Sequence, residues 1–470
     1  MQQESYPQVV KALTRIGELS APLFDATLAL REYLNEPPRI VISGRVKSGK
    51  STLLNALVAA PVAETAALEV TNVVTVYQYG APDRAEAVLR DGARVPITTR
   101  RGEVATLPVE SSQVAYVNRW MPTSQIAEHA LIDTPGLATL TPSNSQTTSA
   151  ALIDGFELTR EAAVDADAAV FLFDAAPRRD ELEFLTRLGF GALNSLGVLS
   201  RADSFDEGAL GPVDPIDAAT RHASLLAKQL SGYVYSVVPV AGLLAETALT
   251  GEVTEQFARH VGSLLGRSDE SLIRAFLDGG STDESLAEVV DKIGEYGLFH
   301  GREEASLGAA AFTEWLLCRS GLEELRSLIN GPLSHFAALQ RTTRVIDRIE
   351  RLAFEYPEHK REIRRVVSEL VTSPDLTDIA LLRAQKDLLR TAPQSDITSV
   401  VTQLLAGARP AEKLGLDADA SSWEMLEQVR SKRAWAQGLS FGLLHPAEEQ
   451  ALVIIGRALD VVEHYAESLT

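Results

Sequence analysis

The stretch from Arg39 to Leu57 limits what this chain can fold into more than any other. A short apolar segment, residues 39–43, runs directly into Gly-Arg-Val-Lys-Ser-Gly-Lys-Ser (44–51), and an apolar helical pattern follows. Strand, glycine-framed loop and helix in this order are typical of a loop that wraps phosphate groups. The alternative is an ordinary glycine turn before a helix. We predict an α/β head with a mostly parallel sheet and flanking helices, built around this loop.

Each position of this loop has a chemical role. The two glycines let the backbone curl, so that successive N–H groups point inward at phosphate oxygens. The helix that follows adds the partial positive charge of its N-terminus. We expect Lys50 to reach the terminal phosphates and the Ser51 hydroxyl to ligate Mg²⁺. The predicted phosphate-binding residues are Gly44, Arg45, Val46, Lys47, Ser48, Gly49, Lys50, Ser51 and Thr52.

A second motif, Asp-Thr-Pro-Gly, follows an apolar strand, with its aspartate at 133 and its glycine at 136. Alone it is also compatible with a plain turn. Behind a phosphate loop, Asp133 is expected to hold Mg²⁺ through a water molecule and the Gly136 N–H to donate to the terminal phosphate. In GTP-binding domains a threonine after the first helix closes over the metal. Thr71 is our candidate for that ligand, and Thr65 is the second.

A third motif, Ser-Arg-Ala-Asp at 200–203, follows another apolar strand. Asp203 can accept hydrogen bonds from both guanine N–H donors, which adenine does not offer in that arrangement. Arg201 is expected to lie along the base, and Ser200 departs from the usual Asn or Thr. Ala241 and Gly242, after the last strand, would face the other side of the base. A capped loop after a strand is the alternative interpretation.

Composition excludes some classes of function. The chain of 470 residues has a formal net charge of −20, which argues against nucleic-acid binding and weakens attraction to anionic membranes unless basic residues gather in one place. Cys318 is the only cysteine, so no intrachain disulfide forms and a cytoplasmic setting fits. Its apolar neighbours predict that it is buried. No stretch is apolar for long enough to span a bilayer, so membrane contact would be peripheral.

The rest of the chain has helical periodicity. We expect N-terminal helices over 1–37, the head over 38–250, and an elongated helical neck and trunk over 251–470. The N-terminal helices should pack on the C-terminal ones. The most regular pattern, 322–354, contains Pro332, which is expected to kink it.

In order and spacing, these motifs resemble the head of dynamin-like GTPases, in particular bacterial ones such as the isoniazid-inducible dynamin-like proteins of mycobacteria. The resemblance rests on residues 44–52, the loop around Thr71, 133–136, 200–203 and 238–242. It implies Mg²⁺-dependent hydrolysis of GTP to GDP, pairing of heads, and binding and remodelling of anionic membrane, by fission or by fusion and repair. It also implies a location at the inner face of the plasma membrane.

The resemblance adds a question about Lys47. In dynamins a small polar residue at this position helps to hold a monovalent cation against the phosphates. Our hypothesis is that the Lys47 ammonium replaces that ion, and the alternative is that it points into solvent. With it, the predicted catalytic residues are Lys47, Lys50, Ser51, Thr71 and Gly136, of which Ser51 and Thr71, with Asp133, would hold the metal.

Two stretches compete as a membrane site. One follows the long helical pattern and is basic, while the other combines charge with aromatic side chains, as an interfacial anchor needs. A solvated face or a helix contact is the alternative for each. The residues are Lys360, Arg361, Arg364 and Arg365 in the first stretch, and Arg430, Lys432, Arg433, Trp435 and Phe441 in the second.

Two other functions remain open at this point. One is a nucleotide-gated assembly GTPase that acts on a protein partner, such as a paralogous dynamin-like protein, without remodelling lipid. The other is a GTPase acting on a ribonucleoprotein, which the net charge of −20 disfavours.

Overall fold

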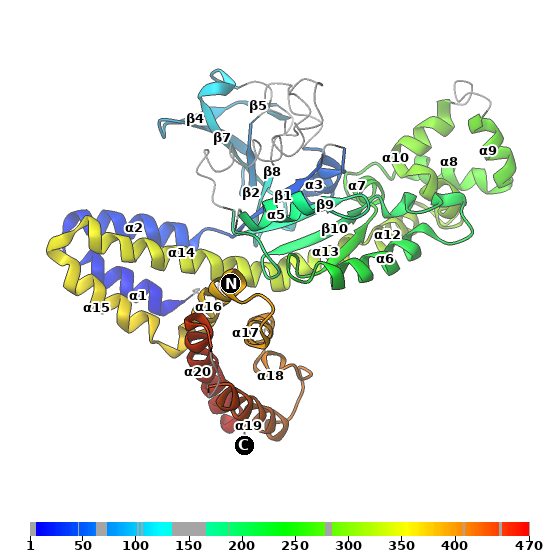
Figure 1. Cartoon of the computed structure of the whole chain (residues 1–470). Helices are drawn as coiled ribbons and strands as arrows, with labels where there is room; N and C mark the ends of the chain where they lie inside the picture. The colour runs from blue at the N-terminus through cyan, green and yellow to red at the C-terminus, as the bar shows by residue number, and fades with distance from the viewer. Residues whose placement is uncertain are drawn as a thin grey trace. The chain divides into compact units, whose positions relative to one another are not determined.

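A computed structural model of the chain describes residues 6–45, 47–62, 73–100, 103–104, 107–133, 166–187, 189–277, 284–407, 409–440 and 444–469. The chain divides into two compact units, whose elements are labelled in Figure 1. Residues 37–334 form the head unit, and residues 1–36 with 335–470 form the helical unit. The head unit is α/β, and the described part of the helical unit is helical. The predicted fold class is confirmed.

Nine strands of the head unit form one mixed sheet in the order β11-β10-β9-β1-β8-β2-β7-β3-β4. They are β1 (Arg39–Gly44), β2 (Thr75–Tyr79), β3 (Arg84–Leu89), β4 (Arg94–Ile97), β7 (Val114–Met121), β8 (Ala130–Asp133), β9 (Ala168–Phe173), β10 (Ser195–Ser200) and β11 (Val237–Val240). Neighbours from β11 to β8 are parallel, whereas β2 is antiparallel to β8. β5 (Thr99–Arg100) and β6 (Glu103–Val104) form a separate pair.

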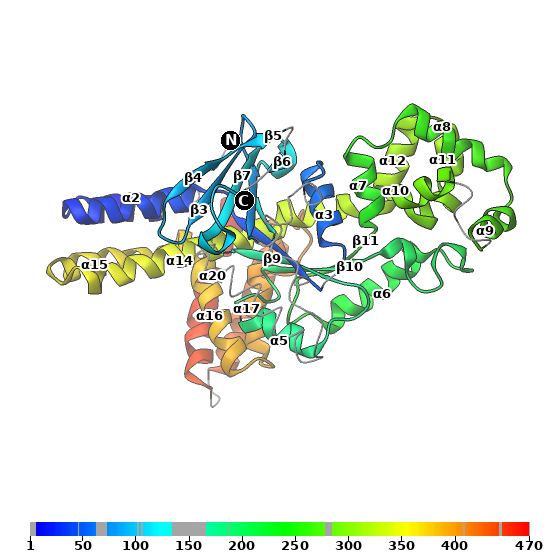
Figure 2. The same ribbon diagram turned by 90° about the horizontal axis from the view of Figure 1, so that it is seen from above.

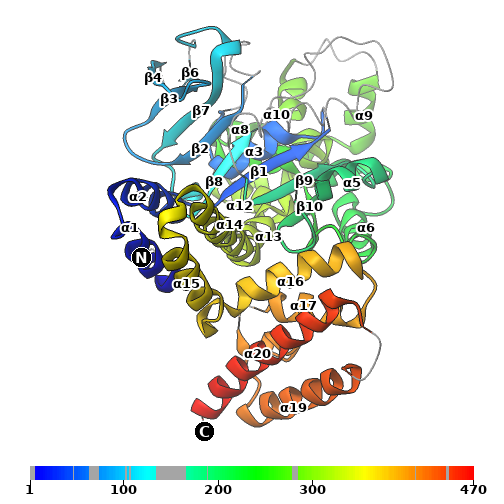
Figure 3. The ribbon, with the colours of Figure 1, turned by 60° about the vertical axis from the view of Figure 1, so that its left-hand side comes forward.

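The parallel half of the sheet places the motifs. Every residue of β9 and β10 is buried, as in a parallel sheet covered on both faces. Figure 3 shows β8, β1, β9 and β10 side by side. Because the carboxyl ends of parallel strands meet at one edge, the loops after these strands converge there, which is where α/β sheets bind ligands.

The helices of the head unit continue well past the last strand. They are α3 (Lys50–Val58), α5 (Arg179–Arg187), α6 (Pro215–Gln229), α7 (Gly242–Leu249), α8 (Glu255–Ser263), α9 (Asp269–Leu277), α10 (Glu284–His300), α11 (Arg302–Ser306), α12 (Ala309–Ser320) and α13 (Leu322–Leu328). Helical periodicity alone predicts residues 251–334 as part of the trunk. The structure groups them with the head because Val261, Ile293 and Phe312 share one buried core with Leu244 of α7.

The helical unit combines both ends of the chain. Its helices are α1 (Pro7–Gly17), α2 (Ala21–Asn35), α14 (Ser334–Glu355), α15 (Lys360–Val371), α16 (Thr377–Thr391), α17 (Asp396–Ala406), α18 (Pro410–Lys413), α19 (Ser422–Leu439) and α20 (Pro446–Ser468). α1 packs on α2 and α15, and Arg15 pairs with Glu369 of α15 at 2.6 Å. α20 packs on α16, α17 and α19.

The most regular helical pattern is interrupted at the predicted proline. α13 ends at Leu328, a π-helical turn spans Ile329–Leu333, and α14 begins at Ser334. Gly331 in that turn has φ −95° and ψ −105°, outside the helical region, and Pro332 cannot donate a helical hydrogen bond. A proline-centred break inside a long periodic segment was therefore predictable from the sequence.

Cys318 is not buried, so the prediction for it was wrong. The buried face of α12 carries Phe312, Leu316 and Ser320, which recur every four residues. Cys318 lies two residues from Leu316 and therefore points to the opposite side of the helix. In the part of the chain that the structure describes, no helix is both long enough and apolar enough to cross a bilayer.

Candidate functional site: the cavity at the carboxyl edge of the sheet

The loop between β1 and α3 has the tight backbone that its glycines predict. Gly44 has φ +154°, and a Cβ added there would lie 2.6 Å from the Leu172 carbonyl oxygen, so only glycine fits. Gly49 has φ +86°, a left-handed conformation that glycine adopts without strain. α3 begins immediately after it, which brings the N–H groups of the first helical turn to the loop.

Lys50 and Asp133 carry the charges of this site. The Lys50 Nζ donates to the carbonyl oxygens of Gly44 and Arg45, both at 2.9 Å. Burial lowers the pKa of the Lys50 ammonium, while Asp133 opposes that change. Burial likewise raises the pKa of Asp133 to about 6, against the influence of Lys50. Asp133 is in register with Ile42 of the neighbouring β1, so an ammonium and a carboxylate flank the loop.

Arg45 supports the loop from outside. Its guanidinium makes two hydrogen bonds to Glu181 of α5, at 2.5 and 2.8 Å, and lies 3.9 Å from Asp174. The Glu181 side chain is only 4% exposed, so the carboxylate of this pair is shielded from solvent. We predicted Arg45 as a phosphate-binding residue. In the structure its side chain joins the loop to α5 through Glu181. No motif in the sequence indicated this role for Glu181.

A cavity of about 380 Å³ opens beside this loop. It lies where β1, β9, β10 and β11 end, and it is lined by Gly49, Thr52, Leu53, Leu172, Val198, Ser200, Arg201, Asp203, Ser204, Val240, Gly242 and Leu243. Two of the predicted motifs therefore meet in one space: the phosphate loop with the start of α3, and Ser-Arg-Ala-Asp. Its size suits a nucleobase with its sugar.

Ser200, Arg201 and Asp203 of the Ser-Arg-Ala-Asp motif have different structural roles. Ser200 is buried, and its hydroxyl donates to the Phe173 carbonyl of β9 at 3.1 Å, which braces the strand. Arg201 donates from its guanidinium to the Lys47 carbonyl at 2.7 Å, so it links this motif to the phosphate loop. Asp203 lies in a 3₁₀ turn (Ala202–Ser204). Burial raises the pKa of Asp203, and its own N–H and Arg201 oppose the increase.

Of the two predicted residues after the last strand, only one lines the cavity. Gly242 does, and a Cβ added there would lie 3.3 Å from the Thr52 methyl group of α3. Ala241 is fully buried, and its N–H donates to the Ser320 carbonyl at 2.9 Å. Leu243 lines the cavity as well and was not predicted, because nothing in a lone leucine signals such a role.

Several predicted residues lie outside the described ranges. They are Val46, Thr65, Thr71, Gly136 and Phe441. The predicted metal set is therefore represented in the structure by Ser51, which is exposed at the start of α3, and by Asp133.

The residues present fit a nucleotide phosphate with its metal. A Cβ at position 44 would obstruct the loop, as its contact with Leu172 shows. The Ser48 hydroxyl is buried and has no hydrogen-bond partner among the described residues. Lys50 supplies a positive charge against which phosphate oxygens can pack, and Asp133 and Ser51 supply the hard oxygen ligands that Mg²⁺ prefers.

The two predicted membrane stretches differ in their surroundings. Arg361, Arg364 and Arg365 are exposed on α15. In the second stretch, Arg433 pairs with Asp460 at 2.5 Å and Glu463 at 2.6 Å, both on α20. Arg433 of the second stretch is thus used in contacts inside the helical unit, whereas the three arginines of the first stretch face solvent.

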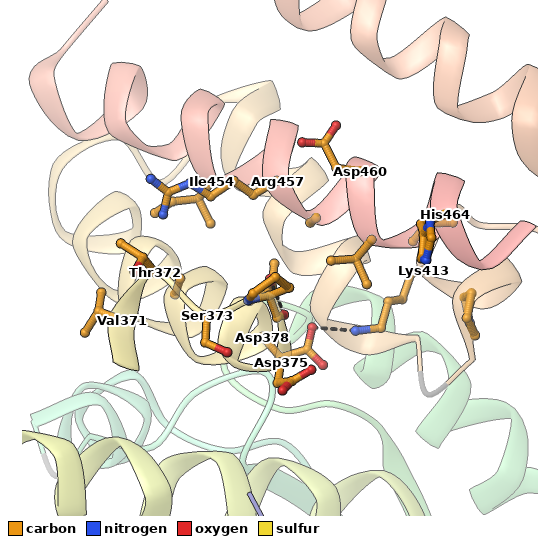
Figure 4. Close-up of a pocket in the computed structure, with 17 residues that line it drawn as sticks. Val371, Thr372, Ser373, Asp375, Asp378, Lys413, Ile454, Arg457, Asp460 and His464 are labelled. Atoms are coloured by element: carbon orange, nitrogen blue, oxygen red, sulfur yellow. Dashed lines mark hydrogen bonds and ion pairs between the residues drawn. The ribbon is translucent and has the colours of Figure 1, made fainter. Parts of the chain in front are cut away.

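A larger cavity of about 700 Å³ lies within the helical unit, among α15, α16, α18 and α20. Its apolar lining includes Ile454 and Val462, and Figure 4 shows Lys413 and Asp378 paired at one side. It contains none of the residues that the sequence analysis singled out.

Comparison with known proteins identifies a family domain within the head unit. Residues 40–188 match the model of the Dynamin family. Isoniazid-induced protein IniC of Mycobacterium tuberculosis, in two strains, is 34% identical to this chain over 252 residues, which are 52% of this chain and 50% of that protein. The match thus spans about half the length of these curated relatives.

Two solved structures are also similar. Both are described as an oligomerised bacterial dynamin pair that senses and tethers membranes. They are 14% and 13% identical to this chain, cover 98% and 99% of it and 74% and 73% of their own lengths, and have TM-scores of 0.32. The resemblance predicted from the motifs is confirmed by the family match and the curated relatives. Residues 40–188 of the chain therefore form a Dynamin-family domain.

Proposed function

We propose that the head unit binds GTP with Mg²⁺ and hydrolyses it to GDP and phosphate. One observation carries the proposal: the phosphate loop and the Ser-Arg-Ala-Asp motif line the same cavity, with Gly49 and Thr52 from one and Asp203 from the other. A nucleotide could therefore place its phosphates at the loop and its base at the carboxylate at once. The match of residues 40–188 to the Dynamin family supports the same assignment.

In this proposal each residue has a defined task. The N–H groups at the start of α3 bind phosphate oxygens, and Lys50 balances the charge that develops when water attacks the γ-phosphate in line. Ser51 and Asp133 would hold Mg²⁺, which supplies further charge stabilisation between the phosphates. Thr71 and Gly136 remain candidates for the metal and phosphate contacts.

Base selection follows from Asp203. A carboxylate that accepts two N–H donors discriminates strongly against a base that cannot offer them, because its buried oxygens would be left unpaired. Arg201 stays on the Lys47 carbonyl, so it holds the base loop and the phosphate loop at a fixed separation.

Two substitutions test this assignment by calorimetric titration with GTP and ATP. Lys50→Ala should weaken binding of both nucleotides on the order of 100-fold, because a charged partner of the phosphates is lost. Asp203→Asn should weaken GTP by a similar factor and leave ATP unchanged. Lys228→Ala, an exposed lysine of α6, is the control. Normal GTP affinity in Lys50→Ala would refute the site.

We further propose that the helical unit contacts anionic lipid and that the heads pair with one another when nucleotide is bound. The lipid proposal rests on a tip surface formed by Phe24, Phe354, Lys360, Arg361 and Arg364. Phe24 is 57% and Phe354 is 65% exposed. The Phe354 ring centroid lies 5.4 Å from the Lys360 Nζ and 5.7 Å from the Arg364 guanidinium.

The fold of the helical unit supports this tip surface. The turn from α1 to α2 and the turn from α14 to α15 lie at the same end of their bundle (Figures 1 and 2). Exposed aromatic rings beside cations are what an interfacial anchor requires. Glu358 and Glu362 in the same region reduce the local positive charge, so binding should require a strongly anionic surface.

The alternative is an assembly GTPase that acts on a protein partner, such as a paralogous dynamin-like protein, without remodelling lipid. It shares the nucleotide site and differs only in what the helical unit binds. Absence of lipid binding with an intact nucleotide site would favour it. Location at the inner face of the plasma membrane belongs to the lipid proposal and stands or falls with it.

A further inference from the structure

Helix α10 runs along the loop that follows the Ser-Arg-Ala-Asp motif. Two residues of its second half reach that loop through hydrogen bonds. The Tyr296 hydroxyl donates to Asp214 at 2.9 Å, and the His300 Nε2 lies 2.9 Å from the Ala209 carbonyl oxygen. Tyr296 is only 1% exposed, so this contact belongs to the core of the head unit. The loop that carries Asp203 is therefore held from outside by α10.

The point where α10 meets the cavity is Gly294. Its φ of 65° and ψ of 178° interrupt the helix. This region of backbone space is accessible almost only to glycine. A Cβ added there would point at the nucleotide site, 3.4 Å from the Asp203 Oδ2 and 3.8 Å from the Leu243 Cδ2. Both of these residues line the cavity.

The two halves of α10 on either side of Gly294 are anchored separately. Before the break, the Thr247 hydroxyl of α7 donates to the Lys292 carbonyl. After it, Tyr296 shares Asp214 with Arg319 of α12, whose guanidinium donates to the same carboxylate at 2.5 Å. Asp214 in turn caps the N-terminus of α6. Gly294 is thus fixed from both sides and cannot shift without disturbing one of these contacts.

We propose that Gly294 is a specificity-determining positioning residue, which lets α10 close against Asp203 and hold its carboxylate toward the guanine N–H donors. This inference rests on the proposed GTP site. Without a side chain at 294, α10 can lie behind Asp203 while Asp203 lines the cavity. A Cβ at 294 would reach only ordinary contact distance from Asp203, but a non-glycine residue would be strained at φ 65° and ψ 178°. Relief of that strain would shift α10 relative to Asp203 and misalign a pair of hydrogen bonds that need defined geometry.

The test compares the affinities of GDP, IDP and ADP by calorimetric titration. IDP lacks the 2-amino group of guanine, so the ratio of GDP to IDP affinity reports the alignment of Asp203. Wild-type protein should prefer GDP on the order of 10-fold or more. In Gly294→Ala the GDP to IDP ratio should fall toward one, with ADP affinity unchanged because it depends on the phosphate loop.

Two further variants make the result decisive. Gly251→Ala is the matched control, since Gly251 also has a positive φ of +85° but no atom within 4 Å of an added Cβ. It should leave the ratio unchanged. If Gly294→Ala does not fold, Thr247→Val loosens α10 without changing the backbone of Gly294, and it should lower the ratio several-fold.

The outcomes separate the two claims. A wild-type protein that binds GDP and ADP equally would overturn the proposed function itself. A wild-type preference for GDP that persists in folded Gly294→Ala, or in Thr247→Val where only that variant folds, would overturn this inference alone. An equal loss of GDP, IDP and ADP affinity would also contradict it, because that pattern indicates damage to the phosphate loop.

Discussion

Lys47 and Lys50 are three residues apart and yet have different surroundings. Lys50 is partly buried and bonds to the carbonyls of its own loop. Lys47 is exposed, has a left-handed φ of 64°, and offers its carbonyl to Arg201. Its ammonium is therefore available to solvent or to a phosphate, and both alternatives for Lys47 remain compatible with the structure.

The Lys47 hypothesis makes a kinetic prediction. If its ammonium replaces a monovalent cation, GTP hydrolysis should proceed at the same rate, within about twofold, in sodium, potassium or a bulky organic cation. Lys47→Ser, which restores a small polar side chain, should become potassium-dependent. Phosphate release in the three salts measures both. A strong potassium requirement in the wild-type protein would disprove the hypothesis.

At the scale of elements, α13 contacts the C-terminal end of α3, the helix that begins at the phosphate loop. Arg326 of α13 donates to the Ala56 carbonyl near the C-terminus of α3 at 3.0 Å. The same guanidinium acts on His129, which precedes β8 and is 3% exposed. Burial, with Arg326, lowers the pKa of His129 from 6.5 to about 4.

His129 makes the head unit sensitive to acid. Below pH 6.5 the unfolded chain takes up a proton at this residue, whereas the folded chain does so only near pH 4. Stability is therefore lost as the pH falls through that interval, by about 3 kcal/mol from this group. The free energy of unfolding, measured with urea, should fall in acid for the wild type more than for His129→Gln. The variant should therefore gain stability relative to the wild type as the pH decreases. A pH-independent difference would contradict the assignment.

Elements built from local signals were predictable, and contacts between distant segments were not. The phosphate loop, the strand ahead of it and the break at Pro332 each follow from a few neighbouring residues. Glu181 contacts Arg45, which is 136 residues away in the sequence. Gly294 lies next to Asp203 although it belongs to a helix beyond the last strand. A lone glutamate or glycine carries no periodic or motif signal, so sequence reasoning missed both.

The boundary between head and trunk shows the same limit. Helical periodicity marks residues 251–334 as helical but does not say which core their apolar faces join. The structure assigns them to the head unit because their buried residues meet Leu244 and Ala241 rather than α14 or α20. Cys318 was misplaced for a related reason, since apolar neighbours in sequence do not fix which side of a helix faces inward.

For the whole molecule, the tip surface predicts how the helical unit behaves with lipid. Phe354→Ala should reduce flotation with strongly anionic liposomes at least several-fold, because an exposed ring between two cations is lost. Trp423→Ala is a matched control, since Trp423 is 68% exposed but lies at the start of α19, beside Glu424. Equal loss in both variants, or no flotation of the wild type in any nucleotide state, would argue against the tip surface.

The central claim is that the head unit is a GTPase, and phosphate release is the measurement that tests it most directly. We predict release from GTP but not from ATP, dependence on Mg²⁺, and a rate per molecule that rises with protein concentration as heads pair. Lys50→Ala should show none of this activity. Equal release from ATP, or release that persists in Lys50→Ala, would contradict the account.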